Sequence, residues 1–330
     1  MSRRSLCLLA QQAQHGTGLI ELLIAAALSL GVVLIAILLL QSANSSFIWL
    51  EQSALLQENG RYAIELVGRA LRQTALLDIT QPIAQRYTVP PDGAVRGADA
   101  RSVKFSGAGF SLVNAPVING SDVLVVRFAG AGDSAAGSSA ADTYGSVLNC
   151  AGFAVPALQP DSEDLGWSIF YLAASGTGEP ELRCAYRGAQ QWDTQAIVAG
   201  VESFQVLYGV DTDGDGFANR FLNASGVSAL DAKEATKYSH WTQVVVIRIA
   251  LLLRSPHSLA RESGLSRFEL FGSRYAAEHS SDDPGTRIFL HDLPLNSRKR
   301  VRRMTQSVIY LRNSLQPTTP CTVCTQQDLP

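Results

Sequence analysis

The residues best suited to chemistry form an acidic stretch in the second half of the chain. It reads Asp211-Thr-Asp213-Gly-Asp215-Gly-Phe217-Ala-Asn219. Carboxylates at alternate positions followed by glycine match the start of an EF-hand calcium loop, where the glycine permits a sharp turn. The three aspartates would supply side-chain oxygens, Phe217 its backbone carbonyl and Asn219 its side chain. The spacing therefore predicts a weak Ca²⁺ site with a structural or adhesive role.

This stretch departs from an EF-hand where such a loop closes. Leu222 stands at position 12, which an EF-hand fills with a bidentate glutamate, and the flanking residues are strand-like. Asp231 or Glu234 would have to close the site from further along the chain. An acidic hairpin turn is the alternative, because Asp-Gly pairs also favour tight turns between strands.

Four cysteines, Cys150, Cys184, Cys321 and Cys324, lie beyond the N-terminal region. An even number in an exported domain suggests disulfides, and three pairings are possible. We favour Cys150 with Cys184 and Cys321 with Cys324. The first bond would close a loop of about 35 residues and stabilise the fold by about 3–4 kcal/mol in the chain-entropy model. The C-x-x-C pair also permits a redox or zinc role, although zinc would need two further ligands.

A long apolar segment near the N-terminus is a candidate membrane anchor for the rest of the chain. Residues 22–40 contain nineteen positions without a charge. As an α-helix they would span ~28 Å, close to the ~30 Å of a bilayer's hydrocarbon core. Arg3 and Arg4 precede the segment and no Lys or Arg follows until Arg61, so the positive-inside rule places Met1 in the cytoplasm. A cleaved signal peptide fits poorly because its apolar region is shorter. An uncleaved signal anchor is the alternative.

Glu21 is a carboxylate at the mouth of this apolar segment, where a charge is costly and indicates a function. The local sequence, Gly16-Thr17-Gly18-Leu-Ile-Glu21, resembles the class III signal of type IV prepilins. The resemblance implies that prepilin peptidase cleaves after Gly16 and that Thr17 becomes the methylated first residue. It also implies that Glu21, then fifth, pairs with the amine of a neighbouring subunit. Prepilins more often begin with Phe or Met, but cleavage after Gly18 would leave Glu21 third.

Helical spacing continues beyond the membrane segment. Apolar residues recur at intervals of three, four and seven as far as Leu71, and no proline occurs between Thr17 and Gln81. We therefore expect one helix from Thr17 to about Thr74. Beyond it, β-rich runs predict strands at 122–129, 167–173, 180–187, 200–210, 241–254 and 304–313. The run at 241–254 indicates a central strand with both faces covered.

The predicted fold class is α+β and pilin-like: a long N-terminal α-helix, transmembrane in its first half, packed on a mostly antiparallel β-sheet head. The expected organisation is a leader at 1–16, a transmembrane and assembly helix at 17–40, its amphipathic continuation at 41–80, a β-rich head at 81–315 and a tail with the C-x-x-C pair at 316–330.

Five short strings resemble, in order, the PilW family of minor pilins: 57–63, 69–72, 120–124, 208–211 and 311–313. The resemblance implies a minor pilin that primes assembly of the type IV pilus at or near its tip, with roles in adhesion and twitching motility. Its partners would be other minor pilins, the major pilin, prepilin peptidase and a tip adhesin. It would sit in the inner membrane with its head in the periplasm, and become extracellular in the pilus.

Charge composition argues against a nucleic-acid-binding protein, and the motifs argue against an enzyme. The 27 Lys and Arg residues nearly balance 29 Asp and Glu, so no nucleic-acid partner is expected. The basic run 298–303 (RKRVRR) is interpreted as a solvated loop before the last strand, the alternative being contact with DNA, an anionic surface or a partner pilin. No hydrolase, zinc-protease, Walker A or dinucleotide motif occurs, so no enzyme is predicted. Two alternatives remain: a type II secretion pseudopilin, and a membrane-anchored, calcium-dependent surface-binding module.

Overall fold

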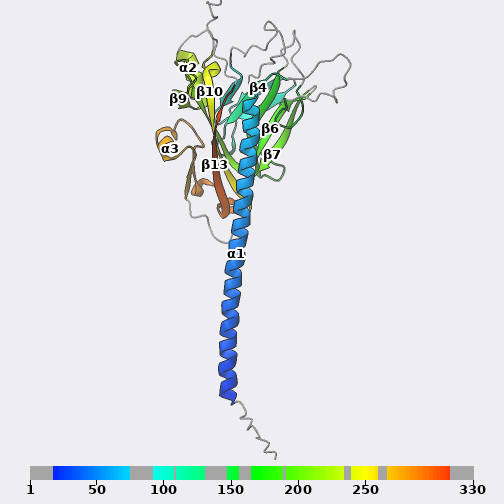
Figure 1. Cartoon of the computed structure of the whole chain (residues 1–330), viewed down its shortest axis with the longest axis vertical. Coiled ribbons are helices and arrows are strands. Elements are labelled where there is room, and N and C mark those ends of the chain that lie inside the picture. The colour runs from blue at the N-terminus through cyan, green and yellow to red at the C-terminus, as the bar shows by residue number, and fades with distance from the viewer. Residues whose placement is uncertain are drawn as a thin grey trace, which may run out of the picture. The chain divides into compact units, whose positions relative to one another are not determined.

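The computed structural model describes residues 18–74, 92–107, 109–130, 147–155, 165–188, 191–233, 239–258 and 266–312. The chain divides into two units, Met1–Glu51 and Gln52–Pro330. Helix α1 (Leu19–Arg72), blue in Figure 1, supplies the described part of the first unit and the beginning of the second. The long N-terminal helix predicted from the apolar spacing is confirmed.

The second unit contains two larger antiparallel sheets (Figure 1). The five-stranded sheet consists, in spatial order, of β1 (Val95–Ala98), β4 (Val123–Phe128), β5 (Gly166–Ala174), β6 (Pro180–Arg187) and β7 (Trp192–Ala199). The four-stranded sheet consists of β13 (Arg300–Tyr310), β10 (Val244–Ser258), β8 (Val201–Val210) and β9 (Arg220–Leu222). Every strand pairing is antiparallel, so the predicted α+β class is confirmed.

Two hairpins and several short helices complete the second unit. The hairpins pair β2 (Ser102–Ser106) with β3 (Gly109–Val113) and β11 (Arg267–Glu269) with β12 (Arg287–Phe289). The α-helices are α2 (Ala224–Lys233), α3 (Ser273–His279) and α4 (Leu295–Arg298), and the 3₁₀ turns are η2 (Ile118–Gly120), η3 (His240–Gln243) and η4 (Leu290–Asp292). The short α-helices and 3₁₀ turns lack a long apolar period, and the sequence did not indicate them.

Strand β10 is the central strand expected from the run at 241–254. It pairs with β13 on one side and β8 on the other, and its residues from Val244 to Leu253 are buried except Arg248. On β8 the alternating residues Phe204, Val206 and Tyr208 share the main core. Strand β13 begins at Arg300, four residues before the expected start.

The second half of α1 packs on the head through one face. Its buried residues recur at helical intervals: Gln52, Leu56, Gly60, Ala63, Val67, Gly68, Ala70 and Leu71. Gly60 lets the helix approach β13 and β10, because an added Cβ would lie 2.6 Å from the Thr305 hydroxyl oxygen and 3.4 Å from a Leu253 methyl carbon. This close contact explains a glycine that intrinsic helix propensity alone disfavours.

Candidate assembly helix and calcium loop

Glu21 lies in the first turn of α1, where Gly18 is the residue before the helix. The Gly18 backbone N–H donates to Glu21 Oε2 at 3.2 Å, and the Gly18 carbonyl accepts from the Glu21 N–H at 2.9 Å. A carboxylate three residues into a helix satisfies an otherwise unpaired N–H and interacts favourably with the positive end of the helix dipole. Glu21 is therefore held at the N-terminal end of the helix. Gly16 and Thr17 lie outside the described residues.

The first unit presents an apolar surface. Every residue from Gly18 to Glu51 is exposed, including Leu19 at 75% and Leu40 at 71%. Among the described residues, α1 is the one helix long and apolar enough to cross a membrane. An exposed helix that is apolar all round requires lipid or other subunits to cover it. The helix therefore fits a membrane anchor.

Asp211 organises the acidic loop that follows β8. It is 1% exposed, and its two oxygens accept from the Gly214 N–H at 2.7 Å and the Gly216 N–H at 2.8 Å. Burial alone would raise the pKa of Asp211, but the hydrogen bonds from the Gly216 and Gly214 amides outweigh it and lower the pKa. Asp211 is therefore a carboxylate in the neutral pH range, around which the loop folds.

The predicted metal ligands meet in part. One oxygen each from Asp211, Asp213 and Asp215 lies within 4.8 Å of the others. Asn219 instead braces the loop: its amide nitrogen donates to Asp213 at 2.9 Å and its oxygen accepts from the Thr212 N–H at 2.6 Å. Each carboxylate oxygen keeps acceptor capacity after its hydrogen bonds, so the donor set fits a hard cation such as Ca²⁺.

The surroundings of the loop were predicted less well. Asp231 binds elsewhere: its Oδ1 accepts from the His240 backbone N–H at 2.6 Å and lies 2.8 Å from the His240 ring nitrogen Nδ1. It is therefore committed to η3 and does not close the loop. Glu234 lies outside the described residues. The Phe217 ring is 70% exposed beside the loop.

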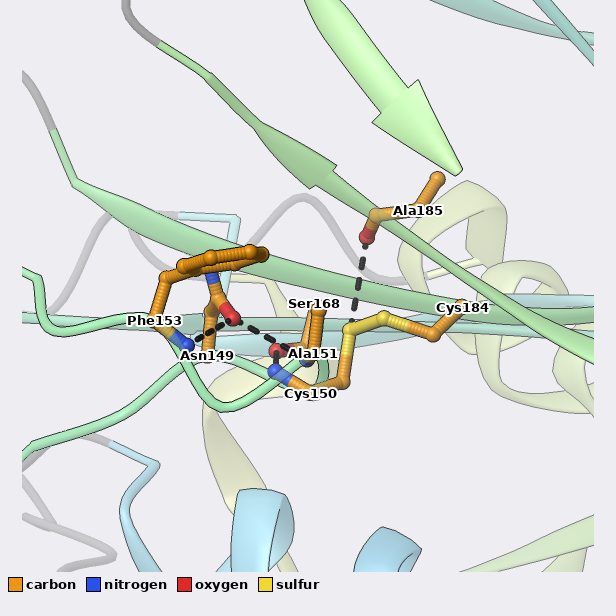
Figure 2. Close-up of a disulfide and its surroundings, with 7 residues drawn as sticks. All are labelled: Asn149, Cys150, Ala151, Phe153, Ser168, Cys184 and Ala185. Atoms are coloured by element: carbon orange, nitrogen blue, oxygen red, sulfur yellow. Dashed lines mark hydrogen bonds between the residues drawn. A yellow bond between two sulfur atoms is a disulfide. The ribbon is translucent and has the colours of Figure 1, made fainter. Parts of the chain in front are cut away.

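Cys150 and Cys184 form a disulfide, the pairing that the sequence analysis favoured (Figure 2). The bond ties the segment 147–155 to β6. The Cys150 N–H also donates to the Ser168 hydroxyl at 3.0 Å, and the Asn149 side-chain oxygen accepts from the Phe153 N–H at 3.1 Å (Figure 2). The segment is therefore held by a covalent bond and by hydrogen bonds. Cys321 and Cys324 lie outside the described residues.

The basic run 298–303 is not a solvated loop, so that interpretation is wrong. Arg302 is fully buried and donates to both oxygens of Glu202, at 2.6 and 3.0 Å. Arg300 donates to both oxygens of Glu179 at 2.9 Å. Arg254 joins the two carboxylates, at 3.0 Å from Glu202 and 2.6 Å from Glu179. These arginines hold β13 to its neighbours and do not present a surface for DNA.

Glu202 is the residue that sequence reasoning missed here. It lies on β8 at 1% exposure, in a strand whose other residues are also buried. A charged residue inside an apolar strand requires a buried partner, and this is the signal that could have been noticed.

The fold is α+β and pilin-like. Its long N-terminal apolar helix has a carboxylate in the first turn, and the second half of this helix packs on an antiparallel head. Residues 169–313 match the family model of PilW, the type IV pilus-assembly protein W, which covers the chain from β5 to the end of β13. This part of the chain, residues 169–313, is therefore similar to the PilW family.

Other comparisons add little to this family match. The chain is similar to a solved type IV-like pilin, TTHA1219 from Thermus thermophilus, at 13% identity and a TM-score of 0.32 over 79% of this chain and 97% of that one. No curated protein matches the sequence.

Proposed function

We propose that this protein is a minor pilin that takes part in priming assembly of the type IV pilus and is placed at or near its tip. The observation that carries the proposal is one chain combining the exposed apolar helix headed by Glu21 with the PilW match at 169–313. The role is structural: the helix joins a helical filament core and the head contacts other minor pilins and the major pilin.

The same proposal assigns roles at the N-terminus. Prepilin peptidase cleaves after Gly16, the new Thr17 amine is methylated, and the helix stays in the inner membrane with the head in the periplasm until assembly. The position of Glu21 at the first turn of α1 supports its pairing with the amine of a neighbouring subunit, because a carboxylate in lipid is stabilised by such a charge partner.

A second proposal concerns the acidic loop. We propose that Asp211, Asp213 and Asp215 hold Ca²⁺, supported by the convergence of their oxygens within 4.8 Å. The exposed Phe217 ring beside them would give the loop an apolar contact for a surface or a tip adhesin.

The assembly role is tested in a deletion strain of the source cell. The strain is complemented with wild type, Gly16→Ala, Glu21→Ala or the control Glu51→Ala, which alters an exposed glutamate further along α1. We expect sheared surface pili and twitching to be lost in the empty strain and strongly reduced with Gly16→Ala and Glu21→Ala. Glu51→Ala should restore both.

Type II secretion is measured in the same strains. Normal secretion alongside lost pili supports the minor pilin. Lost secretion with normal pili would show a pseudopilin, and normal pili with normal secretion in the empty strain would contradict both assembly roles.

A further inference from the structure

Three aspartates from distant parts of the chain meet inside the head, away from the loop at 211–219. Asp99 lies in the turn after β1, Asp122 immediately precedes β4, and Asp283 lies between α3 and β12. One carboxylate oxygen of each lies within 4.8 Å of the other two. No spacing in the sequence would reveal this group, which we call the buried aspartate cluster.

Two members of the buried aspartate cluster are almost completely removed from solvent. Asp122 is 2% exposed and accepts from the Ala100 N–H at 3.3 Å and the Val206 N–H at 2.9 Å. Asp283 is 1% exposed, and its Oδ2 accepts from the Tyr275 hydroxyl at 2.9 Å. Its other oxygen, Oδ1, is buried without a hydrogen-bond partner. An ionised carboxylate oxygen in that state is destabilising unless something positive approaches it.

Asp99 connects the cluster to solvent and to α2. It is partly exposed, and its oxygens accept from the Ala224 N–H at 2.8 Å and the Ser225 N–H at 2.7 Å, at the start of that helix. The backbone N–H groups and the Tyr275 hydroxyl that donate to the three carboxylates are uncharged. None of the three aspartates forms a salt bridge with a described residue.

Tyr208 provides an observation independent of the carboxylates. It is 1% exposed, and its hydroxyl is buried without a hydrogen-bond partner. The hydroxyl lies against β1, where a Cβ built on Gly97 would overlap its oxygen. Burial raises the pKa of Tyr208 well above its usual value, and the charges of Asp122, Asp99 and Asp283 raise it further. The hydroxyl therefore lies against the end of β1 that leads into Asp99, as a buried oxygen without a hydrogen-bond partner.

The cluster as it stands is electrostatically unfavourable. Like charges this close in a low-dielectric interior repel one another, and Asp122 and Asp283 are almost completely removed from solvent. A proton would relieve one charge. A cation bound by the three carboxylates would offset their charges together and supply a positive partner inside a cluster in which Asp283 Oδ1 has none.

We propose that Asp99, Asp122 and Asp283 bind a hard divalent cation, with Ca²⁺ as the ion tested. Oxygen-only donors select hard cations, and Ca²⁺ accepts irregular coordination. Such an ion ties together the turn after β1, the start of β4 and the loop between α3 and β12. The site is distinct from the loop at 211–219 and does not depend on the role of the protein in the pilus.

The test uses the full chain, purified in detergent and stripped of metal. The loop is first disabled by Asp213→Asn with Asp215→Asn, two exposed positions whose loss should not unfold the head. We then titrate this variant with Ca²⁺ alone by calorimetry and by thermal unfolding. We expect one remaining Ca²⁺ per chain and a rise in Tm with Ca²⁺. Absence of both in this variant would overturn the proposal, whether or not the wild-type loop binds calcium.

The ion is assigned to the cluster by adding Asp283→Asn or Asp99→Asn to the loop-disabled chain. Each should weaken the remaining Ca²⁺ binding at least tenfold and remove the Tm rise. Asp282→Asn is the matched control, because it neutralises the exposed neighbour outside the cluster and should change neither. Unchanged Ca²⁺ binding in Asp283→Asn and Asp99→Asn would overturn the proposal. A higher Tm for either of these two variants than for the loop-disabled chain, both measured in saturating Ca²⁺, would also overturn it. That result would show that neutralising an aspartate, and not binding a metal, relieves the repulsion between the carboxylates.

Discussion

Replacing Glu202 by glutamine should destabilise the head by removing one charge from a buried network. The Glu202 side chain is 2% exposed, and the Arg302 side chain that it binds is fully buried. Glu202→Gln keeps the shape of the side chain but leaves the Arg302 guanidinium with neutral partners, chiefly the Ser297 carbonyl at 2.8 Å. Arg254 is affected less, because it keeps Glu179 as a partner at 2.6 Å.

The expected loss is about 3–5 kcal/mol, the usual cost of leaving one member of a buried ion pair uncompensated. This is a large share of the ~5–15 kcal/mol that stabilises a typical domain. Arg303→Ala, which removes an exposed arginine from the same basic run, should cost about 0.5 kcal/mol or less. The double variant Glu202→Gln with Arg302→Met should recover part of the loss, because no unpaired charge stays buried at this pair.

Urea unfolding of the full chain in detergent, followed by tryptophan fluorescence, measures these differences. Two results would refute the reasoning. One is a loss in Glu202→Gln no larger than that in Arg303→Ala. The other is a double variant whose loss of stability equals the losses of Glu202→Gln and Arg302→Met measured separately and added. The two charges would then be uncoupled.

Three further outcomes follow from the head. Replacing Cys150 and Cys184 by alanine should lower the free energy of unfolding by about 3–4 kcal/mol, because the disulfide joins residues 34 apart. Equal unfolding midpoints of the wild type with and without reductant would contradict this. Gly60→Ala should cost about 1–3 kcal/mol, because the added methyl group would clash with β13. Gly68→Ala should be neutral or stabilising, because its methyl group meets the flexible end of Arg72 most closely. A stabilised Gly60→Ala variant would disprove the close packing. The pKa of Glu179 is lowered in the folded state, first by its hydrogen bond from Arg300. The ionised Glu179 carboxylate therefore stabilises the fold above the pKa it has in the unfolded chain, and this stabilisation is lost as the pH falls through its pKa in the folded protein. Wild-type Tm should therefore fall more than that of Glu179→Gln between pH 7 and about 3, and parallel curves would count against the ion pair.

Local patterns predicted the elements with a strong period. The apolar run and its helical continuation gave α1, and the β-branched runs gave β4, β5, β6, β8 and β10 within a few residues of their observed ends. The acidic spacing indicated a loop whose three carboxylates do converge.

Contacts between distant segments were beyond reach of local patterns. Arg302 was read as solvated because its neighbours are charged, and its burial depends on Glu202, one hundred residues away. The buried aspartate cluster has the same origin, since Asp99, Asp122 and Asp283 become neighbours only when three loops meet. Asp231 shows the converse: it is close in sequence to the acidic loop, but the fold directs it to His240.

The state of the N-terminus tests the proposed pilin role most directly. The protein is purified from membranes of cells with and without prepilin peptidase, and its first residue and intact mass are determined. We expect a chain that begins at methylated Thr17 only when the peptidase is present, and an unprocessed Met1 when it is absent. An intact Met1 in both strains would contradict the account and show a signal-anchored protein.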